Sequence, residues 1–139
     1  MDLIIMTREI VKAIEACGLR AVDDVEDIDA GAVWIENLSK LRGSSNKSNE
    51  KNKFLATLNI YELHTRKLKL FQEAEELHKK IKDNFFKDDD FGFNIEVSVR
   101  EEYAKKVSAD VGKLYQYTIT LVIKTTPILP QSLGVSNFK

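Results

Sequence analysis

Two stretches in the C-terminal half of the chain alternate between apolar and polar residues. In residues 115–126 one parity holds Tyr115, Tyr117, Ile119, Leu121 and Ile123, and the other is polar except for Val122. Residues 93–103 repeat the pattern, with Phe93, Ile95, Val97, Val99 and Tyr103 on one parity. A period of two in aromatic and β-branched residues is typical of strands with one buried face. The two stretches predict an antiparallel hairpin whose apolar face is covered by helices.

A second hairpin is predicted around a polar segment. Val33 and Ile35 share one parity in residues 32–38, with Trp34 on the other, and apolar residues alternate again over 54–63. Between these strands, residues 42–53 contain no apolar side chain, four basic residues and one acidic residue. Because this segment has nothing to bury, we expect a solvated, mobile loop.

Two other segments have helical periodicity. In residues 2–17 the apolar positions are Leu3, Met6, Ile10, Ala13, Ile14 and Cys17, with Asp2 placed to cap the start and Gly18 to close the end. In residues 67–84 they are Leu70, Ala74, Leu77 and Ile81. On that second helix, Glu75 and Lys79 have the i,i+4 spacing of an ion pair.

The resulting order is helix, two strands, helix, two strands. It predicts an α+β fold, α-β-β-α-β-β, with two helices packed on one face of an antiparallel four-stranded sheet (32–38, 54–63, 93–103 and 113–126). A chain of 139 residues has the length of one domain. We expect this domain to span residues 1–126, with the loop at 42–53, and residues 127–139 to form a flexible C-terminal tail that begins at Pro127.

The composition excludes a globally basic nucleic-acid binder. The net formal charge is −1, charged residues make up 31% of the chain, and hydrophobic residues make up 43%. The single cysteine, Cys17, permits no internal disulfide. Residues 1–8 have no basic leader and only a four-residue apolar run, so we expect a soluble protein without a membrane span.

Five carboxylates lie within seven positions, at Asp23, Asp24, Glu26, Asp27 and Asp29. This density raises two alternatives, a cation site and a solvated acidic loop. No register of the segment has the ligand spacing of an EF-hand loop, and the same is true of Asp88–Gly92. The spacing therefore favours a solvated loop.

Few residues are suited to catalysis. The histidines are His64 and His78, and Glu75 with His78 forms a single Glu-x-x-His motif, whereas di-iron bundles need two such motifs on different helices. The six glycines are scattered one to a turn and form no phosphate-binding loop. We expect no catalytic site, no cofactor and no metal.

The element order and three of its features resemble the neck proteins of long-tailed bacteriophages and prophages, known as tail terminators, tail-completion or head–tail joining proteins. The three features are Trp34-Ile35 in the hairpin at residues 32–63, the helix at Leu70–Ile81 crossing the sheet, and the matched closing strands. The resemblance implies an α/β sandwich that assembles into a hexameric ring capping the tail tube, with no catalytic residues. It also implies a virion protein made in the bacterial host cytoplasm, with the tail tube protein or the head connector as partner and DNA only passing through the ring.

Loops of such proteins face the tube or the connector. The resemblance therefore implies that the basic loop, with Arg42, Lys47, Lys51 and Lys53, lies at a partner surface. For the contact between copies in the ring, we expect that either the acidic loop, with Asp23, Asp24, Glu26 and Asp27, or the polar face of the sheet meets a different surface of the neighbour. The alternative is a small monomeric nucleic-acid-binding module that uses the basic 42–53 loop, and steeply salt-dependent DNA binding would distinguish it.

Overall fold

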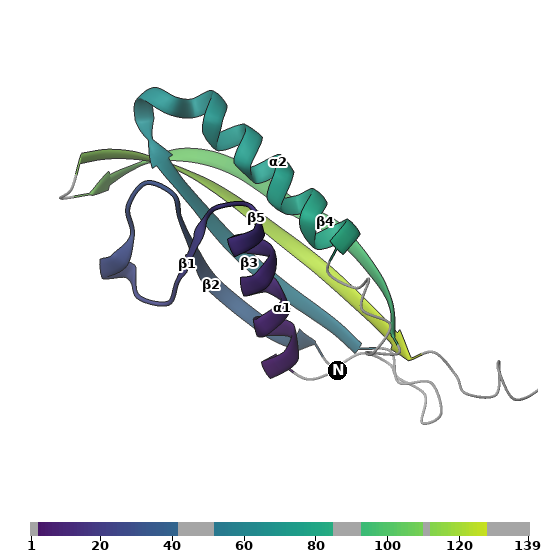
Figure 1. Ribbon diagram of the computed structural model, residues 1–139. Coiled ribbons are helices and arrows are strands. Elements are labelled where there is room, and N and C mark those ends of the chain that lie inside the picture. The colour runs from purple at the N-terminus through teal and green to yellow at the C-terminus, as the bar shows by residue number, and fades with distance from the viewer. Residues whose placement is uncertain (1–2, 42–51, 85–92, 110–111, 128–139) are drawn as a thin grey trace, which may run out of the picture.

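A five-stranded sheet carries both helices on one of its faces (Figure 1). The computed structural model describes residues 3–41, 52–84, 93–109 and 112–127. The strand order across the sheet is β1-β2-β3-β5-β4. The elements are α1 (Leu3–Ala16), β1 (Arg20–Val22), the 3₁₀ turn η1 (Val25–Asp27), β2 (Ala32–Leu41), β3 (Asn52–Leu63), the 3₁₀ turn η2 (His64–Arg66), α2 (Lys67–Asn84), β4 (Phe93–Ala109) and β5 (Gly112–Pro127).

The predicted α+β class and the two helices are confirmed. Gly18 has φ +76 and follows the last turn of α1, where its N–H donates to the carbonyl of Glu15 at 2.9 Å. A residue with a Cβ is strained in this left-handed conformation, which is why the helix ends at glycine. The predicted N-cap, Asp2, lies outside the described residues.

The prediction of a four-stranded, wholly antiparallel sheet is wrong in one strand. β1 pairs in parallel with β2, with Arg20 opposite Ala32 and Val22 opposite Trp34, so the sheet is mixed. Three residues are too few to show an alternation, and β1 was therefore not predicted. The remaining pairs are antiparallel, as predicted.

Three predicted boundaries also change. Asn52 and Lys53 belong to β3, where they pair with β5, and not to the loop predicted over 42–53. β2 continues to Leu41 and β4 to Ala109, well beyond the predicted strand ends at 38 and 103. The rest of that loop, and the tail after Pro127, lie outside the described residues.

The core lies between the helices and one face of the sheet. Met6, Ile10 and Ile14 of α1 and Leu70, Leu77 and Ile81 of α2 pack against strand residues such as Leu58 and Leu121. All of these side chains are buried, and each contributes roughly 2 kcal/mol through apolar area removed from water. None of the described helices is long and apolar enough to cross a membrane.

A β-bulge in β4 changes which of its residues face the helices. Val99 pairs with Leu121, but after the irregularity Glu102 pairs with Ile119 and Tyr103 with Thr118. The extra residue shifts the parity, so Tyr103 lies on the face away from the helices and not with Val99, as the alternation predicted. In its place Glu102 turns toward α2.

The sheet face away from the helices is polar, as predicted, but part of it is buried. Gln116 Nε2 donates to Asn59 Oδ1 at 3.0 Å, Thr118 Oγ1 donates to the same oxygen at 2.7 Å, and Asn59 Nδ2 donates to Glu36 Oε1 at 3.2 Å. Asn59 is 0% exposed. Because the buried amides are bonded to one another, this face needs no covering helix to satisfy them.

Candidate interaction surfaces

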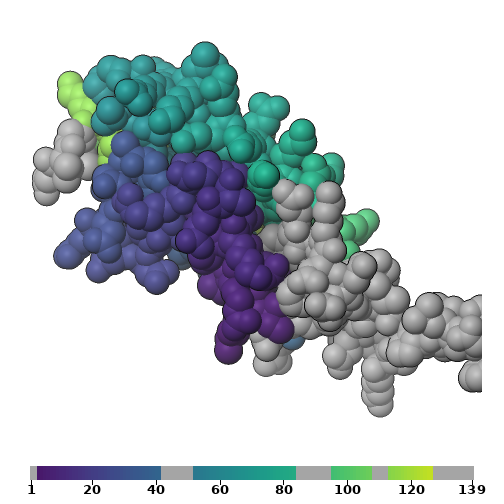
Figure 2. Space-filling view, in the orientation of Figure 1, coloured from purple at the N-terminus to yellow at the C-terminus, as the bar shows by residue number. Residues whose placement is uncertain are grey.

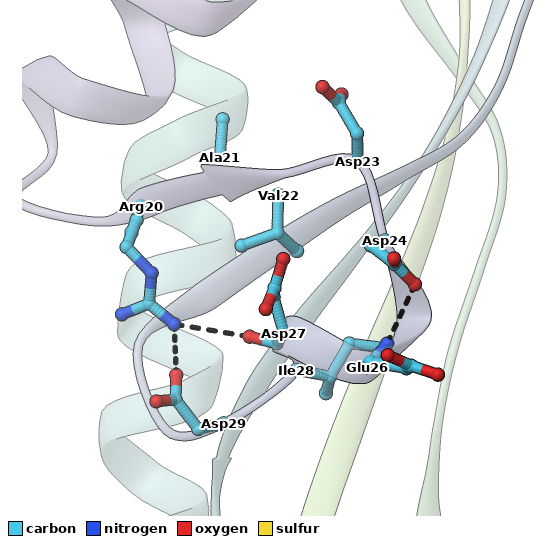
Figure 3. A pocket seen from close by; sticks show the side chains of 9 residues that line it. All are labelled: Arg20, Ala21, Val22, Asp23, Asp24, Glu26, Asp27, Ile28 and Asp29. Carbon is cyan, nitrogen blue, oxygen red and sulfur yellow. Dashed lines mark hydrogen bonds and ion pairs between the residues drawn. The ribbon is translucent and has the colours of Figure 1, made fainter.

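The acidic loop, residues 23–29, is built around a short helical turn at the end of β1 (Figure 3). Asp24 caps η1, because its Oδ1 accepts a hydrogen bond from the Glu26 N–H at 3.0 Å. Arg20 closes the loop by pairing with the Asp29 carboxylate and by donating to the Asp27 carbonyl at 3.2 Å. The sequence predicted the loop, but not its anchoring by Arg20.

Four residues of the acidic loop keep their carboxylates accessible to solvent. The four predicted to meet a partner, Asp23, Asp24, Glu26 and Asp27, are exposed and lie together around a hollow of about 580 Å³. Arg20 offsets the charge of Asp29 but leaves these four without an ion pair among the described residues. Within the same residues no cluster of three or more histidine, cysteine or acidic side chains is placed to hold a metal ion. The loop is thus an anchored surface of concentrated negative charge.

Of the four basic residues predicted to meet a partner, the described part of the chain includes Lys53, which is not brought to this loop. Lys53 is exposed on β3 between Leu41 and Lys124. Asn59 is in line with Val22 at the start of the acidic loop. Lys53 lies six residues along β3 from Asn59, a distance of about 20 Å. Arg42, Lys47 and Lys51 lie outside the described residues.

A basic segment on β4 was not predicted as a surface. Among the described strands β4 has one neighbour, β5, so its other edge is open. A row of paired residues crosses the whole sheet, from Val22 through Trp34, Asn59 and Thr118 to Tyr103. Close to Tyr103 on β4 are three exposed basic residues, Arg100, Lys105 and Lys106, together with Glu101 and Glu102. Only the order of the strands places this segment opposite the acidic loop, at the same level of the sheet.

A groove lies between α2 and the outer two strands. Its lining residues are Phe71, Ala74, Glu75, His78, Glu102, Tyr117 and Ile119, and its volume is about 500 Å³. We call it the α2–β4 groove. The Phe71 and Tyr117 rings meet edge to face with centroids 5.7 Å apart, and Tyr117 Oη donates to Glu102 Oε2 at 2.8 Å. Burial and then this hydrogen bond to a carboxylate raise the pKa of Tyr117 to about 12, so the phenol stays protonated and fixes the position of Glu102.

The residues with catalytic potential are dispersed. His78 lies in the α2–β4 groove with Glu75, whereas His64 is near the Lys113 carbonyl at the end of the sheet. Burial, followed by the charge of Glu76, raises the pKa of the Cys17 thiol, and this disfavours the reactive thiolate. No protein-family model matches the chain, and no curated protein matches its sequence.

The arrangement of these surfaces is suited to association with other proteins. The acidic loop and the basic segment of β4 are different in charge, lie on opposite edges of one sheet, and are both accessible. The acidic loop of one copy can pair with the basic segment of another copy, and the basic segment of the first copy then stays free for a further copy.

Proposed function

We propose that the chain is a structural protein of a long-tailed phage or prophage that assembles into a ring at the junction of tail and neck, as a tail terminator or head–tail joining component. One observation carries the proposal: the acidic loop and the basic segment of β4 lie at the same level on opposite edges of the sheet. The resemblance in element order supports the phage assignment.

This placement of charge favours a closed ring over an open filament. Contacts between two unlike surfaces are head-to-tail, and they close into a ring when each copy is rotated relative to the last without advancing along an axis. Because the two surfaces share one level, joining them adds little displacement along the strands. A ring of six copies is the size that the resemblance implies.

Charge alone does not supply the affinity. Exposed ion pairs contribute roughly 0.2–1 kcal/mol each, and Glu101 and Glu102 lie among the three basic residues of β4. The charges therefore select the orientation of the contact but add little to its affinity. The open edge of β4, a strand of 17 residues, offers main-chain hydrogen bonds to the neighbouring copy. Assembly should therefore weaken at high salt but persist at high protein concentration.

The partners proposed for the ring are the tail tube protein and the head connector protein, with DNA passing through the centre. The protein is made in the bacterial host cytoplasm and is retained in the virion. In this proposal the acidic loop serves the contact between copies, and the segment at residues 42–53 is left to meet the tube or the connector.

Sedimentation velocity and negative-stain microscopy of the purified protein test the assembly. The wild type should form closed rings, and Lys105→Glu with Lys106→Glu should dissociate them. Adding Asp23→Lys and Glu26→Lys to the same chain should restore them. The matched control is Lys40→Glu with Lys53→Glu, which makes the same charge change at the other end of the sheet and should leave the rings intact.

Two outcomes contradict the proposal. A wild-type protein that stays monomeric at high concentration and does not bind isolated tail tubes has no joining role. DNA binding that falls steeply with salt, with a log–log slope near the number of basic residues in 42–53, points instead to the nucleic-acid-binding alternative.

A further inference from the structure

The helices of the described residues cover β4 only in part. α1 packs on β1, β2 and α2, while α2 packs mainly on β3 and β5, and the two helices lie side by side (Figure 2). The part of β4 that faces the helices is therefore left open beside α2. Phe71 is 42% exposed and Val99 is 36% exposed along this opening.

The α2–β4 groove combines aromatic rings with two carboxylates that have no cation. Glu75 forms no ion pair among the described residues, although its spacing to Lys79 predicted one, and Glu102 accepts only the Tyr117 hydroxyl there. The next tyrosine on this face of β5, Tyr115, has the Lys67 ammonium 4.9 Å from its ring centroid. The described residues place no such cation at Tyr117. Rings beside carboxylates suit a guanidinium, which can stack on a ring and donate to an acid together.

The outward face of α1 has the complementary chemistry. Ile4 is 69% exposed, and Arg8, one turn later on the same face, is also exposed. Arg8 forms no ion pair among the described residues. An apolar side chain followed one turn later by a guanidinium matches a groove lined by Phe71 and two glutamates.

Arg8 also lies at the same level along the strand direction as the groove residue Glu102. Arg8 precedes Cys17 by nine residues, which is about 13 Å along the helix axis. Since α1 crosses the strands obliquely (Figure 1), this corresponds to about three to four strand residues. The C-terminal end of α1 leads into Arg20, whose row reaches β4 near Lys105. Counting three to four residues back along β4 from Lys105 reaches Glu102 and Glu101.

We infer that the α2–β4 groove is the docking site for α1 of a second copy of this chain, with Arg8 of that copy placed between Glu75 and Glu102. The inference rests on the proposed ring. When the β1 edge of one copy meets the β4 edge of the next, the neighbour's α1 lies over the uncovered part of β4. The helix layers of adjacent copies then form one continuous ring.

Mixing two charge-reversed proteins tests this inference. Arg8→Glu and Glu75→Arg, each alone, should weaken association about tenfold or more by sedimentation velocity. An equimolar mixture should recover wild-type assembly, because a ring that alternates the two proteins again sets opposite charges at positions 8 and 75 of every contact. Lys53→Glu makes the same charge change at an exposed site at the other end of the sheet and serves as the control. Circular dichroism of each variant checks that α1 and α2 still fold.

The outcomes separate this inference from the ring itself. If the wild type forms rings and Arg8→Glu forms them equally well, the groove is not the docking site, and the ring proposal stands. If both single variants fail and their mixture also fails, the pairing of Arg8 with Glu75 is wrong. If the wild type does not associate, both proposals fall.

Discussion

Glu73 on α2 and Glu62 on β3 form a carboxyl pair between the helix and the sheet. Two buried oxygens, Glu62 Oε2 and Glu73 Oε1, have no hydrogen-bond donor among the described residues. The Lys69 ammonium is 3.7 Å from Glu62 Oε2. The pKa of Glu73 is raised from 4.5 to about 7, mainly by burial. A hydrogen bond to Glu62 and the negative charge of Glu62 also raise this pKa, whereas the positive charge of Lys69 lowers it. A proton on Glu73 makes it the donor that the pair lacks.

This pair makes stability depend on pH. Because the pKa of Glu73 is raised in the folded state, the folded protein binds this proton more tightly than the unfolded chain does. The resulting stabilisation is complete below pH 4.5 and is lost as the pH rises through about 7. A pKa difference of this size corresponds to at most about 3 kcal/mol, and screening of the partly exposed Glu73 reduces this to about 1–2 kcal/mol.

Glu73→Gln isolates this contribution. An amide stays neutral and can donate to Glu62 at every pH, so the variant should match the wild type at pH 4 and exceed its unfolding free energy by about 1–2 kcal/mol at pH 8. Urea denaturation followed by the fluorescence of Trp34 measures both proteins. Glu15→Gln, at an exposed site on α1, should show no such trend. Parallel pH profiles for wild type and Glu73→Gln would refute the shared proton.

Two further predictions concern the sheet and the polar segment. Ile119→Asp should lower the free energy of unfolding by about 3–5 kcal/mol, because it buries an unpaired charge at a position 2% exposed. Thr120, on the other face, is partly exposed, so Thr120→Asp should lower it by less than about 1 kcal/mol. Equal urea midpoints for the two variants would show that the faces are wrongly assigned. Replacing residues 44–51 by Gly-Asn should leave the melting temperature within about two degrees, because loop closure depends weakly on length. The same change should abolish tail completion in a phage assembly assay, and normal tails from the shortened protein would exclude a joining role for the segment.

Alternation and helical spacing were sufficient to predict most of the elements. The parity of Tyr115, Tyr117, Ile119, Leu121 and Ile123 does face the helices in the structure, and α2 has the predicted bounds. These predictions succeed because the residues of a buried face recur at a regular interval along the chain, every two residues in a strand and every three to four in a helix.

The sequence was less informative where structure depends on single residues. β1 is too short to show a period, and it owes its place to pairing with β2. The bulge near Arg100 inserts one residue and so reverses the face of Tyr103. Neither feature changes the local composition enough to be read from it.

The candidate surfaces divide in the same way. The sequence by itself identified the acidic loop, because its five carboxylates lie close together along the chain. The basic segment of β4 and the α2–β4 groove were decided by tertiary structure. Strand order sets Arg100, Lys105 and Lys106 across the sheet from that loop, and the bulge turns Glu102 toward Tyr117. Residues that act together there are distant in sequence, and only packing determines which of them meet.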